Sequence, residues 1–568
     1  MQNAQIARAL DTIATLMEIK DEAYYRVLGY RRAAESVLSL GRPAREVEDL
    51  KTLPHVGAAL AETIRDLAED RTPKVLSDLL EEVPSGLVEV TRLPGVGPRT
   101  AGRLWRELGV TDVPQIALLE EGRLAALKGF GKKSEERILR AARNYDALER
   151  RMLLNDATAL AGQMLGFVRS HPACERAEVA GSLRRGKETI GDIDIVAASR
   201  SGGELADAFA EAPFADEVLA HGPSKVFVKA HGVEVDLRIV EPEAFGALLH
   251  HFTGGQAHNI SLRERAVKMG INISEYGLAE IGTGRYEPVA SEGEIYSRLG
   301  LDYIPPELRE DTGEIEAAEK GKLPNLVEVS DVRGDLHVHT NYSDGRGTIE
   351  SMAEAAISLG YEYLVFCDHS QSLRVANGLS PARLKEKIKA VRAADEKYGE
   401  IRLLCGSEVD VLKDGSLDYE DDLLAELDFV VASVHTSFQL KEKEMTERIV
   451  RAMNNPYVRT VGHPTGRILN RREPYEVDVP RLILEARAAN TALELNSYPD
   501  RLDLAVPYVR EAINAGVRIT IDTDAHDETA LGFAKFGVTQ ARRAWVEKSS
   551  VINCLPRAEF EEYLAQGK

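Results

Sequence analysis

Hydrophobic residues recur at helical spacing in the first part of the chain. Within residues 1–20 they repeat every three or four positions, so they share one face of an amphipathic helix. These residues are Ile6, Leu10, Ile13, Leu16 and Met17. Later in residues 1–150, short glycine-containing segments are each followed by another stretch with helical spacing. Residues 1–150 are therefore predicted to be helical.

From residue 151 the spacing of hydrophobic residues changes to two. The segments RAEVAGSL, DIDIVAAS, KVFVKAHG and VEVDLRIV alternate apolar and polar residues, as strands with one solvent-exposed face do. A polar, acidic stretch at 305–330 is typical of a linker. After residue 331, strand and helix patterns alternate regularly, which favours a parallel α/β architecture. The predicted fold class is multidomain, with α+β and α/β parts.

Composition places the chain among globular proteins of several domains. It has 568 residues, of which 44% are hydrophobic and 29% charged, and this length exceeds one ordinary core. No apolar run reaches the roughly 18 residues that span a bilayer, and the N-terminus lacks the basic and apolar regions of a secretory signal. The four scattered cysteines form no CxxC pair, which suits a reducing compartment. We therefore predict a cytoplasmic protein without membrane attachment.

The net charge of −21 at first argues against a nucleic-acid partner. Basic and acidic residues nearly balance in residues 1–150, however, and the excess of carboxylates lies in residues 151–568. Carboxylates that ligate cations would add to this acidity. Local patches are therefore a better guide to binding partners than the net charge.

Three short repeats in the helical part share the pattern Leu, two residues, an apolar residue and Gly. They are LPHVGAALAETI (53–64), LPGVGPRTAGRL (93–104) and LKGFGKKSEERI (127–138). Such helix-hairpin-helix motifs present backbone N–H groups and a helix N-terminus to a phosphate, and they bind DNA strands without reading bases. One copy would equally be a plain turn between helices, but three copies favour DNA binding. The predicted DNA contacts are Gly57, Gly95, Gly97, Gly129, Gly131, Lys132 and Lys133, and the first copy has His55 in place of a glycine.

Two aspartates share one face of a predicted strand within GSLRRGKETIGDIDIV, residues 181–196. Asp192 and Asp194 lie two positions apart, and a third carboxylate, Asp236, belongs to the strand VEVDLRIV. Three such carboxylates can hold two Mg²⁺ ions roughly 4 Å apart for in-line phosphoryl transfer. A lone DxD is more often a solvated strand edge, but the preceding Gly-Ser and Asp236 favour a catalytic site.

The order GSxRRG, GDIDI, a single strand aspartate and HFTGG…HN resembles the nucleotidyltransferase fold of the family X DNA polymerases, the polymerase beta family, over residues 1–315. The resemblance implies a DNA polymerase that acts on gapped or primer–template DNA with deoxynucleoside triphosphates and Mg²⁺ or Mn²⁺. It implies that Asp192, Asp194 and Asp236 are the catalytic metal ligands. It further implies that Ser182 and Arg185 contact the triphosphate, Phe252 and Gly254 the sugar, Asn259 the base edge and Arg263 the template side. Tyr30, Arg31 and Arg32 resemble the family's pocket for a 5′-phosphate at a gap.

Three departures from the family pattern change these expectations. His251 stands where the family's vertebrate members have a tyrosine, which puts the usual steric discrimination against ribonucleotides in doubt. Glu234 stands where a basic residue is familiar and adds a fourth carboxylate. Ala59 and Thr63 occupy the positions expected for the Schiff-base lysine of a lyase. A lyase needs a nucleophilic amine, so deoxyribose-phosphate lyase activity is predicted to be absent or weak.

In the C-terminal half, predicted strands end in residues that bind metals. The segments are RGDLHVHT with His337, His339 and the nearby Asp344, YLVFCDHS with Asp368 and His369, RLLCGSEVDV with Glu408, FVVASVHTS with His435, RTVGHPTG with His463, RITIDTDAH with Asp524 and His526, and ALELNS with Asn496. The strand C-termini of a parallel (β/α) barrel converge on one face, so these groups would meet. A single histidine is more often a core or surface residue, but this many strands ending in ligand types favours a metal centre. The set is too large for one ion and suits a trinuclear cluster of Zn²⁺, Mn²⁺ or Fe²⁺.

Residues 331–568 resemble the PHP (polymerase and histidinol phosphatase) domain, a distorted seven-stranded barrel of metal-dependent phosphoesterases. The resemblance implies three metal sets, namely His337, His339, Glu408 and Asp524, then Glu408, His435 and His463, and finally Asp344, His369 and His526. The implied reaction is attack by a metal-activated hydroxide on a phosphate ester. On DNA this would be a 3′→5′ exonuclease, with abasic-site endonuclease and 3′-phosphatase action as alternatives.

The predicted organisation has six parts. They are an N-terminal DNA-end-binding domain (1–80), a second helical domain (81–150), a nucleotidyltransferase palm (151–245), a nucleotide-selecting subdomain (246–315), a linker (316–330) and a PHP barrel (331–568). Together they predict a monomeric gap-filling repair enzyme with two active sites. The alternatives are a small-molecule phosphatase with a degenerate DNA-binding half, and a non-catalytic scaffold that binds DNA ends.

Overall fold

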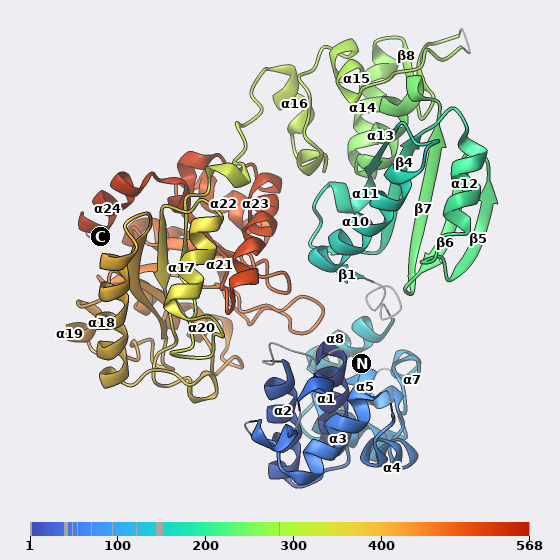
Figure 1. Ribbon diagram of the computed structural model, residues 1–568. Coiled ribbons are helices and arrows are strands. Elements are labelled where there is room, and N and C mark those ends of the chain that lie inside the picture. Colours follow the sequence, from blue (N-terminus) through green and yellow to red (C-terminus); the bar gives the residue numbers. More distant parts are fainter. Residues whose placement is uncertain are drawn as a thin grey trace. The chain divides into compact units, whose positions relative to one another are not determined.

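The computed structural model describes residues 3–38, 44–47, 49–53, 55–69, 71–91, 93, 95–120, 122–143, 151–282 and 285–566. The chain divides into two compact units, Met1–Glu149 with Asn470–Arg472, and Arg150–Leu469 with Glu473–Lys568 (Figure 1). The predicted boundary at residue 150 lies outside the described residues. Within them, none of the helices combines the length and the apolar character needed to cross a bilayer.

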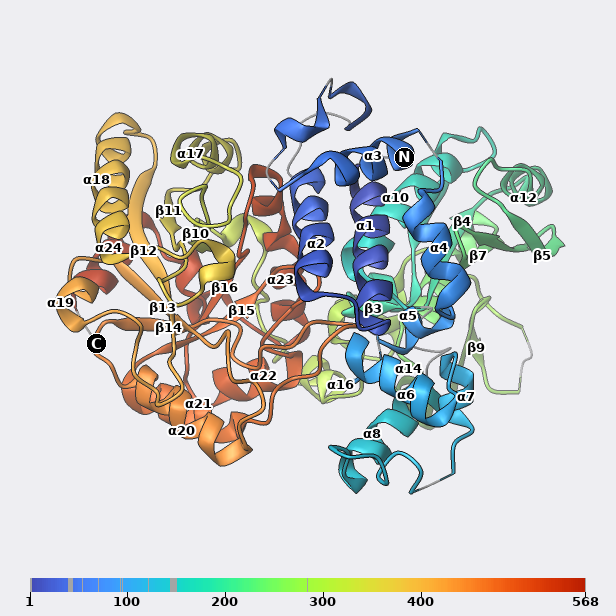
Figure 2. The same ribbon diagram turned by 90° about the horizontal axis from the view of Figure 1, so that it is seen from below.

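The first unit is built from helices around one core. Its helices are α1 (Asn3–Ile19), α2 (Tyr24–Leu38), α3 (Ala58–Ala68), α4 (Lys74–Glu82), α5 (Gly86–Val90), α6 (Pro98–Leu108), α7 (Val113–Ala117) and α8 (Lys132–Arg143), with 3-10 turns η1 (Ala44–Glu46) and η2 (Leu50–Thr52). Helix α1 packs against α2, α3, α4, α5 and α6 (Figure 2). The predicted apolar face of α1 is buried, and one cluster of buried side chains runs from Ile6 to Ala142. The parts predicted as two domains, 1–80 and 81–150, therefore share a single core within the described residues up to 143.

The three Gly-containing repeats each form a turn that leads into a helix. Helices α3 and α6 begin directly after Gly57 and Gly97. Two residues earlier, the middle repeat has Gly95 with φ of 84°, and the first repeat has His55 in the same left-handed region with φ of 61°. Glycine adopts this conformation without the steric cost that a Cβ imposes. The histidine in the first repeat therefore strains a turn that the glycines of the other copies form freely.

The second unit begins with a five-stranded mixed sheet of order β2-β4-β7-β6-β5. Its strands are β2 (Arg176–Val179), β4 (Asp192–Ala198), β5 (Glu217–Gly222), β6 (Lys225–Ala230) and β7 (Val233–Val240), beside the short pair β1 (Met152–Leu153) and β3 (Thr189–Ile190) and the helices α10 (Leu154–Ser170), α11 (Gly181–Arg184) and α12 (Gly202–Ala210). Strands β4 and β7 are parallel, and the other neighbours are antiparallel. The strand predicted over RAEVAGSL is too long. It ends at Val179 because Gly181, with φ of 59°, turns the chain into α11.

A smaller subdomain follows the sheet. It contains η3 (Pro242–Ala244), α13 (Phe245–Thr253), α14 (Gln256–Lys268), the hairpin β8 (Ile271–Ser274) and β9 (Gly277–Glu280), α15 (Glu292–Arg298), η4 (Pro306–Leu308), α16 (Glu314–Glu319) and η5 (Val329–Asp331). The segment predicted as a linker, 316–330, is packed on both of its neighbours. Leu326 joins the core of this subdomain, and Val327 joins the core of the barrel that follows.

The C-terminal part is a parallel seven-stranded sheet in sequential order. Its strands are β10 (Gly334–Val338), β11 (Tyr363–Phe366), β12 (Arg402–Asp410), β13 (Phe429–Ser433), β14 (Val458–Val461), β15 (Ala492–Asn496) and β16 (Ile519–Asp522). Its helices are α17 (Ile349–Ser358), α18 (Pro381–Lys397), α19 (Asp421–Leu424), α20 (Glu442–Met453), α21 (Val479–Ala489), α22 (Val506–Asn514), α23 (Ala534–Arg543) and α24 (Arg557–Ala565), with 3-10 turns η6 (Arg374–Ala376), η7 (Glu528–Phe533), η8 (Lys548–Ser550) and η9 (Ile552–Cys554). A bridge between Val338 and Ala525 brings the first strand beside the end of the last. The sheet is therefore nearly closed, and the predicted fold class is confirmed.

The five-stranded sheet and the barrel share hydrophobic packing. The core of the sheet includes Leu502 and Phe536, which both belong to the barrel and are buried. Burial of apolar area is the main stabilising contribution in such an interface. The barrel thus completes the hydrophobic core beneath the five-stranded sheet.

Candidate active sites

The predicted carboxylates of the first site lie on two adjacent strands. Parallel pairing of β4 and β7 sets Asp194 opposite Asp236, and Asp192 opposite Glu234. Alternate residues of a strand face the same side of a sheet, so all four carboxylates share one face. The three predicted ligands are therefore brought together, and Glu234 lies beside them.

Asp194 lies partly buried in this cluster. Burial, and then repulsion by Asp192 and Asp236, raises the pKa of Asp194 to about 7. A divalent cation between the carboxylates would remove this repulsion. Backbone comes close to the same side chain, because a Cβ built on Gly181 would lie 2.0 Å from Asp194 Oδ2. The first glycine of the GSLRRG motif is thus required for the carboxylate to keep its position.

Sequence reasoning missed Arg238, which neutralises part of the acidic cluster. Its Nε and one terminal nitrogen each donate to a different oxygen of Asp236 at 3.0 Å. The guanidinium also lies 4.9 Å from the ring centre of Phe252, at cation–π distance. A basic residue two positions after a strand aspartate faces the same side of the sheet as the aspartate. This spacing could have identified Arg238 from the sequence.

The predicted triphosphate contacts lie in the turn after β2. Ser182 Oγ is buried without a hydrogen-bond partner, and it sits in the first turn of the short helix α11. The Arg185 guanidinium donates to the backbone oxygen of Thr253 at 2.7 Å and to Glu310 at 3.1 Å. Lys187 donates to the other oxygen of Glu310 at 2.6 Å. Two cations and one unpaired hydroxyl therefore gather beside the carboxylates.

The remaining predicted nucleotide contacts form one cluster at the end of α13. Asn259 Nδ2 donates to the His251 backbone oxygen at 2.9 Å, and Arg263 lies 3.0 Å from His251 Nδ1. A Cβ on Gly254 would lie 2.3 Å from Asn259 Oδ1. The contact with Arg263 therefore fixes the orientation of the His251 imidazole.

A buried ion-pair network supports this cluster from behind. Glu292 accepts from Arg184 at 2.6 and 2.9 Å and from the fully buried Arg309 at 2.5 Å. Burial alone would raise the pKa of Glu292, but Arg184 and Arg309 outweigh it and lower this pKa to about 2. Arg184 also donates to the Thr253 hydroxyl at 2.6 Å. The network therefore joins the phosphate-side turn to α13 and α15.

Replacing Glu292 by Gln should destabilise the second unit by about 2 kcal/mol, because the three hydrogen bonds from Arg184 and Arg309 lose their acceptor charge. The depressed pKa means that this contribution is complete above the unfolded pKa near 4.5 and disappears as pH falls toward 2. Urea unfolding at pH 7 and at pH 3 measures the difference. An unfolding free energy that differs equally from wild type at both pH values would contradict this assignment.

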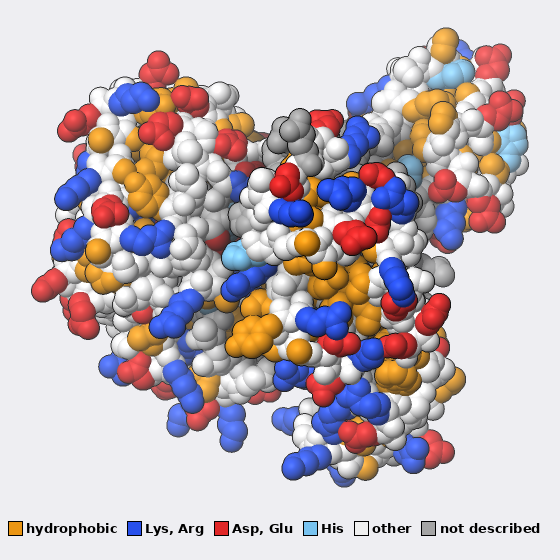
Figure 3. All heavy atoms as spheres, turned by 60° about the horizontal axis from the view of Figure 1, so that its bottom comes forward, with side chains coloured by type: hydrophobic (Ala, Val, Ile, Leu, Met, Phe, Trp, Pro, Cys, Tyr) orange, Lys and Arg blue, Asp and Glu red, His pale blue; other side chains and the backbone are white. Residues whose placement is uncertain are grey.

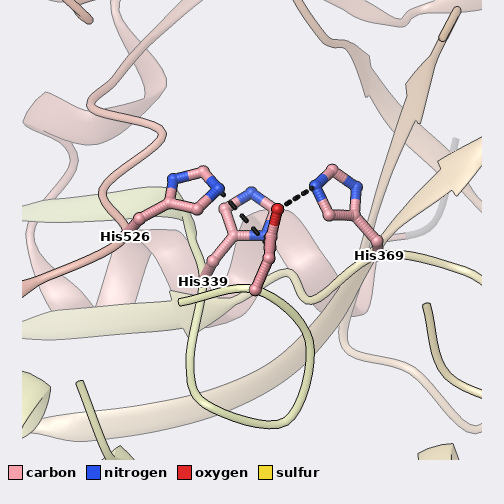
Figure 4. Close-up of side chains that lie close together, drawn as sticks. His339, His369 and His526 are labelled. Carbon is pink, nitrogen blue, oxygen red and sulfur yellow. Dashed lines mark ion pairs between the residues drawn. The ribbon is translucent and has the colours of Figure 1, made fainter. Parts of the chain in front are cut away.

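The predicted ligands of the second site meet at the carboxyl ends of the barrel strands. His339, His369 and His526 lie close together (Figure 4). Their ring nitrogens are 3.8, 3.5 and 3.5 Å from the carboxylate oxygens of Asp344. His337, His339 and Asp524 form a second group whose ligand atoms lie within 4.8 Å of one another. The third group is His369, Glu408 and His435.

Glu408 lies between the groups as the predicted bridging ligand would. One of its oxygens is 2.9 Å from His463 Nε2 and 3.2 Å from His435 Nε2, and the other is 2.8 Å from His369 Nδ1. The grouping differs in detail from the predicted sets, because His369 joins two groups and His339 also joins two. All nine predicted side chains nevertheless belong to one continuous cluster around Glu408, Asp344 and Asp524.

The pKa values of the cluster are shifted in both directions. Burial would lower the pKa values of His337, His369, His435 and His526, but the carboxylates beside them outweigh burial and raise them, so a bound cation would displace these protons. Burial, and then His526 and His369, lowers the pKa of His339 to about 4. Burial would raise the pKa of Glu408, but His435, His369 and His337 outweigh it and hold this pKa well below its ordinary range. His339 Nδ1 and His463 Nδ1 are buried without hydrogen-bond partners. Neutral imidazoles and ionised carboxylates are the donor set that Zn²⁺, Mn²⁺ and Fe²⁺ prefer.

A second layer of carboxylates orients two of the histidines, and sequence reasoning missed both. Glu494 lies 2.6 Å from His337 Nδ1, and Asp410 lies 2.5 Å from His435 Nδ1. Carboxylates on the outer nitrogen of a ligand histidine fix its orientation and raise its basicity. Glu494 interrupts an apolar strand, and Asp410 lies two positions after Glu408 on the same face. Those two patterns could have identified them.

Two of the strand-end groups do not face the cluster as ligands. Asp368 pairs with the buried Lys387 at 2.9 Å and accepts from the hydroxyl of Ser343 at 2.7 Å. Asn496 Nδ2 donates to Asp524 Oδ2 at 3.2 Å. Asp368 therefore supports the loop after β10, and Asn496 orients a predicted ligand.

Some of the DNA contacts predicted in the first unit are exposed, and one is buried. Lys132 and Lys133 are exposed at the start of α8. On the face drawn in Figure 3, Lys and Arg side chains gather on the lobe at the bottom of the view. Tyr30, by contrast, is packed in the core, and Arg31 pairs with Glu18 at 3.0 Å. The ring of Tyr30 therefore packs α2 against the core and does not lie on the surface.

The positions expected for the lysine of a lyase hold no amine, and several of the glycine turns are open. Thr63, one of the two expected lysine positions, is buried and donates its hydroxyl to the Ala59 backbone oxygen at 3.1 Å. A Cβ at Gly57, Gly97 or Gly131 would meet nothing within 4 Å. The backbone at these three positions is therefore open to an approaching phosphate.

Comparison with known families finds matches along most of the chain. Residues 1–73 match a helix-hairpin-helix domain, and residues 87–144 match the SAM-like helix-hairpin-helix tandem. Residues 248–310 match the DNA polymerase beta thumb, and residues 335–497 match the PHP domain.

Three relatives show which parts of the chain recur elsewhere. The DNA polymerase/3'-5' exonuclease PolX of Bacillus subtilis (strain 168) is 39% identical over 99% of both chains. DNA polymerase lambda of Rattus norvegicus is 24% identical over 54% of this chain and 56% of its own. A probable phosphatase of Thermoanaerobacter sp. (strain X514) is 26% identical over 41% of this chain and 95% of its own.

Proposed function

The chain belongs to the family X DNA polymerases that carry a C-terminal PHP domain, and from this premise we propose how its two sites divide the work. It is a DNA polymerase that fills short gaps during repair, and its barrel is a metal-dependent 3'-5' exonuclease. The observation that carries the proposal is that the chain assembles two separate clusters of metal-ligand residues, one on a face of the five-stranded sheet and one at the carboxyl ends of the barrel strands.

Asp192, Asp194 and Asp236 would hold Mg²⁺ or Mn²⁺ in the polymerase site. Such ions lower the pKa of an attacking hydroxyl and neutralise charge on the phosphates in transfer reactions. The chain itself contributes Ser182, whose hydroxyl is free for a phosphate oxygen, and Arg185, whose charge lies beside it. These two groups bind and orient the triphosphate of the incoming deoxynucleotide.

The barrel cluster would hold three divalent ions, drawn from Zn²⁺, Mn²⁺ and Fe²⁺. Its ligands are His337, His339, Asp344, His369, Glu408, His435, His463, Asp524 and His526. Metal ions supply a nucleophile at neutral pH and polarise the phosphoryl group in ester hydrolysis. Glu494 and Asp410 keep two of the imidazoles in the orientation that ligation needs. Abasic-site endonuclease and 3'-phosphatase action use the same chemistry on other DNA ends.

DNA contacts are assigned to the first unit. The open glycine turns and the exposed Lys132 and Lys133 fit a strand backbone, and they would hold the DNA on either side of a gap. We further propose that the protein acts as a cytoplasmic monomer. The alternative assignment is a small-molecule phosphatase, and its support is the probable phosphatase that matches 41% of this chain. It does not explain why Asp192, Asp194 and Asp236 are brought together.

The test is a one-nucleotide-gapped duplex with a labelled primer, incubated with Mn²⁺ or Mg²⁺ and with deoxynucleotides added or omitted. Asp192→Ala should lose extension alone, and His339→Ala should lose shortening alone, each by at least about 100-fold. Wild type that never extends the primer but hydrolyses small phosphate esters would overturn the polymerase assignment. Loss of both activities in either variant would contradict two independent sites.

A further inference from the structure

The phosphate-binding turn of the palm is held from outside the palm. Gly186 is the last residue of the GSLRRG motif, and Lys187 and Glu188 follow it and lead into β3. Gly186 has φ of 66°, and a Cβ built on it would lie 2.1 Å from Cγ2 of Thr539 on α23 of the barrel. The backbone of the turn therefore lies directly against the barrel helix.

Gln540 on α23 makes the central polar contact. Its side-chain amide, fully buried, donates to the backbone oxygen of Gly186 at 2.8 Å. Its own oxygen accepts from Arg543 at 2.7 Å, which fixes the amide with its N–H toward the turn. Both polar atoms of the side chain therefore have a partner, and these two contacts define its orientation.

A second contact reaches the next part of the turn. Arg467 of the barrel binds both oxygens of Glu188, at 2.7 and 3.2 Å, and donates its Nε to the Arg501 backbone oxygen at 3.1 Å. Apolar packing accompanies these polar contacts, because Leu502 and Phe536 are buried in the palm core. Residues on both sides of Lys187 are therefore anchored to the barrel.

We propose that Gln540 and Arg467 of the barrel are positioning residues for the polymerase reaction, because they hold the turn that carries Ser182, Arg185 and Lys187 in the geometry that receives the triphosphate. The inference rests on the proposed polymerase function. Neither residue touches the nucleotide, so they act through the turn. The barrel is then a part of the nucleotide-binding site as well as a second enzyme.

The decisive variant is Gln540→Met, which keeps the length of the side chain and removes both hydrogen-bonding groups. The Gly186 oxygen would lose its donor in a buried place, so the turn would relax and bind phosphates less well. We expect the KM for the deoxynucleotide to rise about tenfold with kcat nearly unchanged, as loss of uniform binding predicts. The inhibition constant of inorganic pyrophosphate should rise in parallel, since pyrophosphate uses the same turn.

The palm-side variant Glu188→Gln tests the second contact without touching the barrel, and it decides the matter if Gln540→Met does not fold. It should raise the same two constants by a smaller factor. Lys535→Met, on the exposed side of α23, is the matched control and should behave as wild type. Exonuclease activity should be unchanged in all three proteins, which shows that the barrel is intact.

Unchanged KM and pyrophosphate inhibition in both Gln540→Met and Glu188→Gln would overturn the inference while leaving the polymerase assignment in place. A raised KM without a change in pyrophosphate inhibition would also overturn it, since the defect would not lie at the phosphates. Wild type whose primer extension is absent, or survives Asp194→Ala, would overturn the proposed function and this inference together.

Discussion

Glu408→Gln should lower exonuclease activity by about 1,000-fold and leave primer extension at the wild-type level. Loss of a residue that only orients a metal ligand lowers activity about 10–100-fold. Loss of a ligand that is shared by several ions should lower it further. The carboxylate contacts His369, His435 and His463 at 2.8–3.2 Å. Glutamine keeps the volume but removes the charge that balances these imidazoles. The bound metal per chain, measured by elemental analysis, should fall as well.

The matched control for this change is Glu426→Gln, which removes an exposed carboxylate of the barrel that pairs with Lys385 at 3.0 Å. A surface pair contributes about 0–1 kcal/mol, so exonuclease activity and metal content should stay at wild-type levels. Glu408→Gln with normal metal content and normal exonuclease activity would exclude the cluster as the nuclease site.

Gly181→Ala should lower primer extension by at least about 100-fold, the cost of moving a reacting group by about 1 Å. The added Cβ would lie 2.0 Å from Asp194 Oδ2 and 3.0 Å from its Cγ, so the carboxylate must move. The residue also has φ of 59°, which disfavours any side chain. Single-turnover extension on the gapped duplex measures the effect, and exonuclease activity should not change.

Gly203→Ala is the control for a glycine change in the palm. It lies in α12, where a Cβ would meet nothing within 4 Å, so extension should be normal and stability unchanged or slightly higher. If both glycine variants extended the primer equally well, Asp194 would not need the space that Gly181 leaves.

The sequence allowed the barrel site to be predicted because a parallel barrel gathers its strand ends. Histidines that follow β10, β13 and β14 meet wherever the strands curve into one face, and no side-chain detail is needed for that conclusion. Asp368 shows the limit of this reasoning. It is adjacent to His369, and consecutive residues of an extended chain point to opposite sides, so only one of the two can reach the cluster. The other finds Lys387, a partner that is distant in sequence.

The partners that orient a site were harder to predict than the site residues. Arg238, Glu494 and Asp410 act on neighbours two positions away or on another strand, so their role depends on register and burial rather than on a motif. The contacts of the barrel with the GSLRRG turn lie more than 250 residues away from it in the chain. Nothing local to either segment indicates such a pairing, because it arises from packing between two folded parts.

The shared core beneath the palm also bears on how the chain is synthesised. Leu502 and Phe536 complete that core, yet they follow the palm strands by more than 250 residues. Domains generally fold as units while the ribosome synthesises the chain from its N-terminus. The palm therefore emerges with an open apolar surface that only the finished C-terminal barrel can cover. A translation product that stops after the polymerase half would expose this surface and become a target for chaperones and proteases.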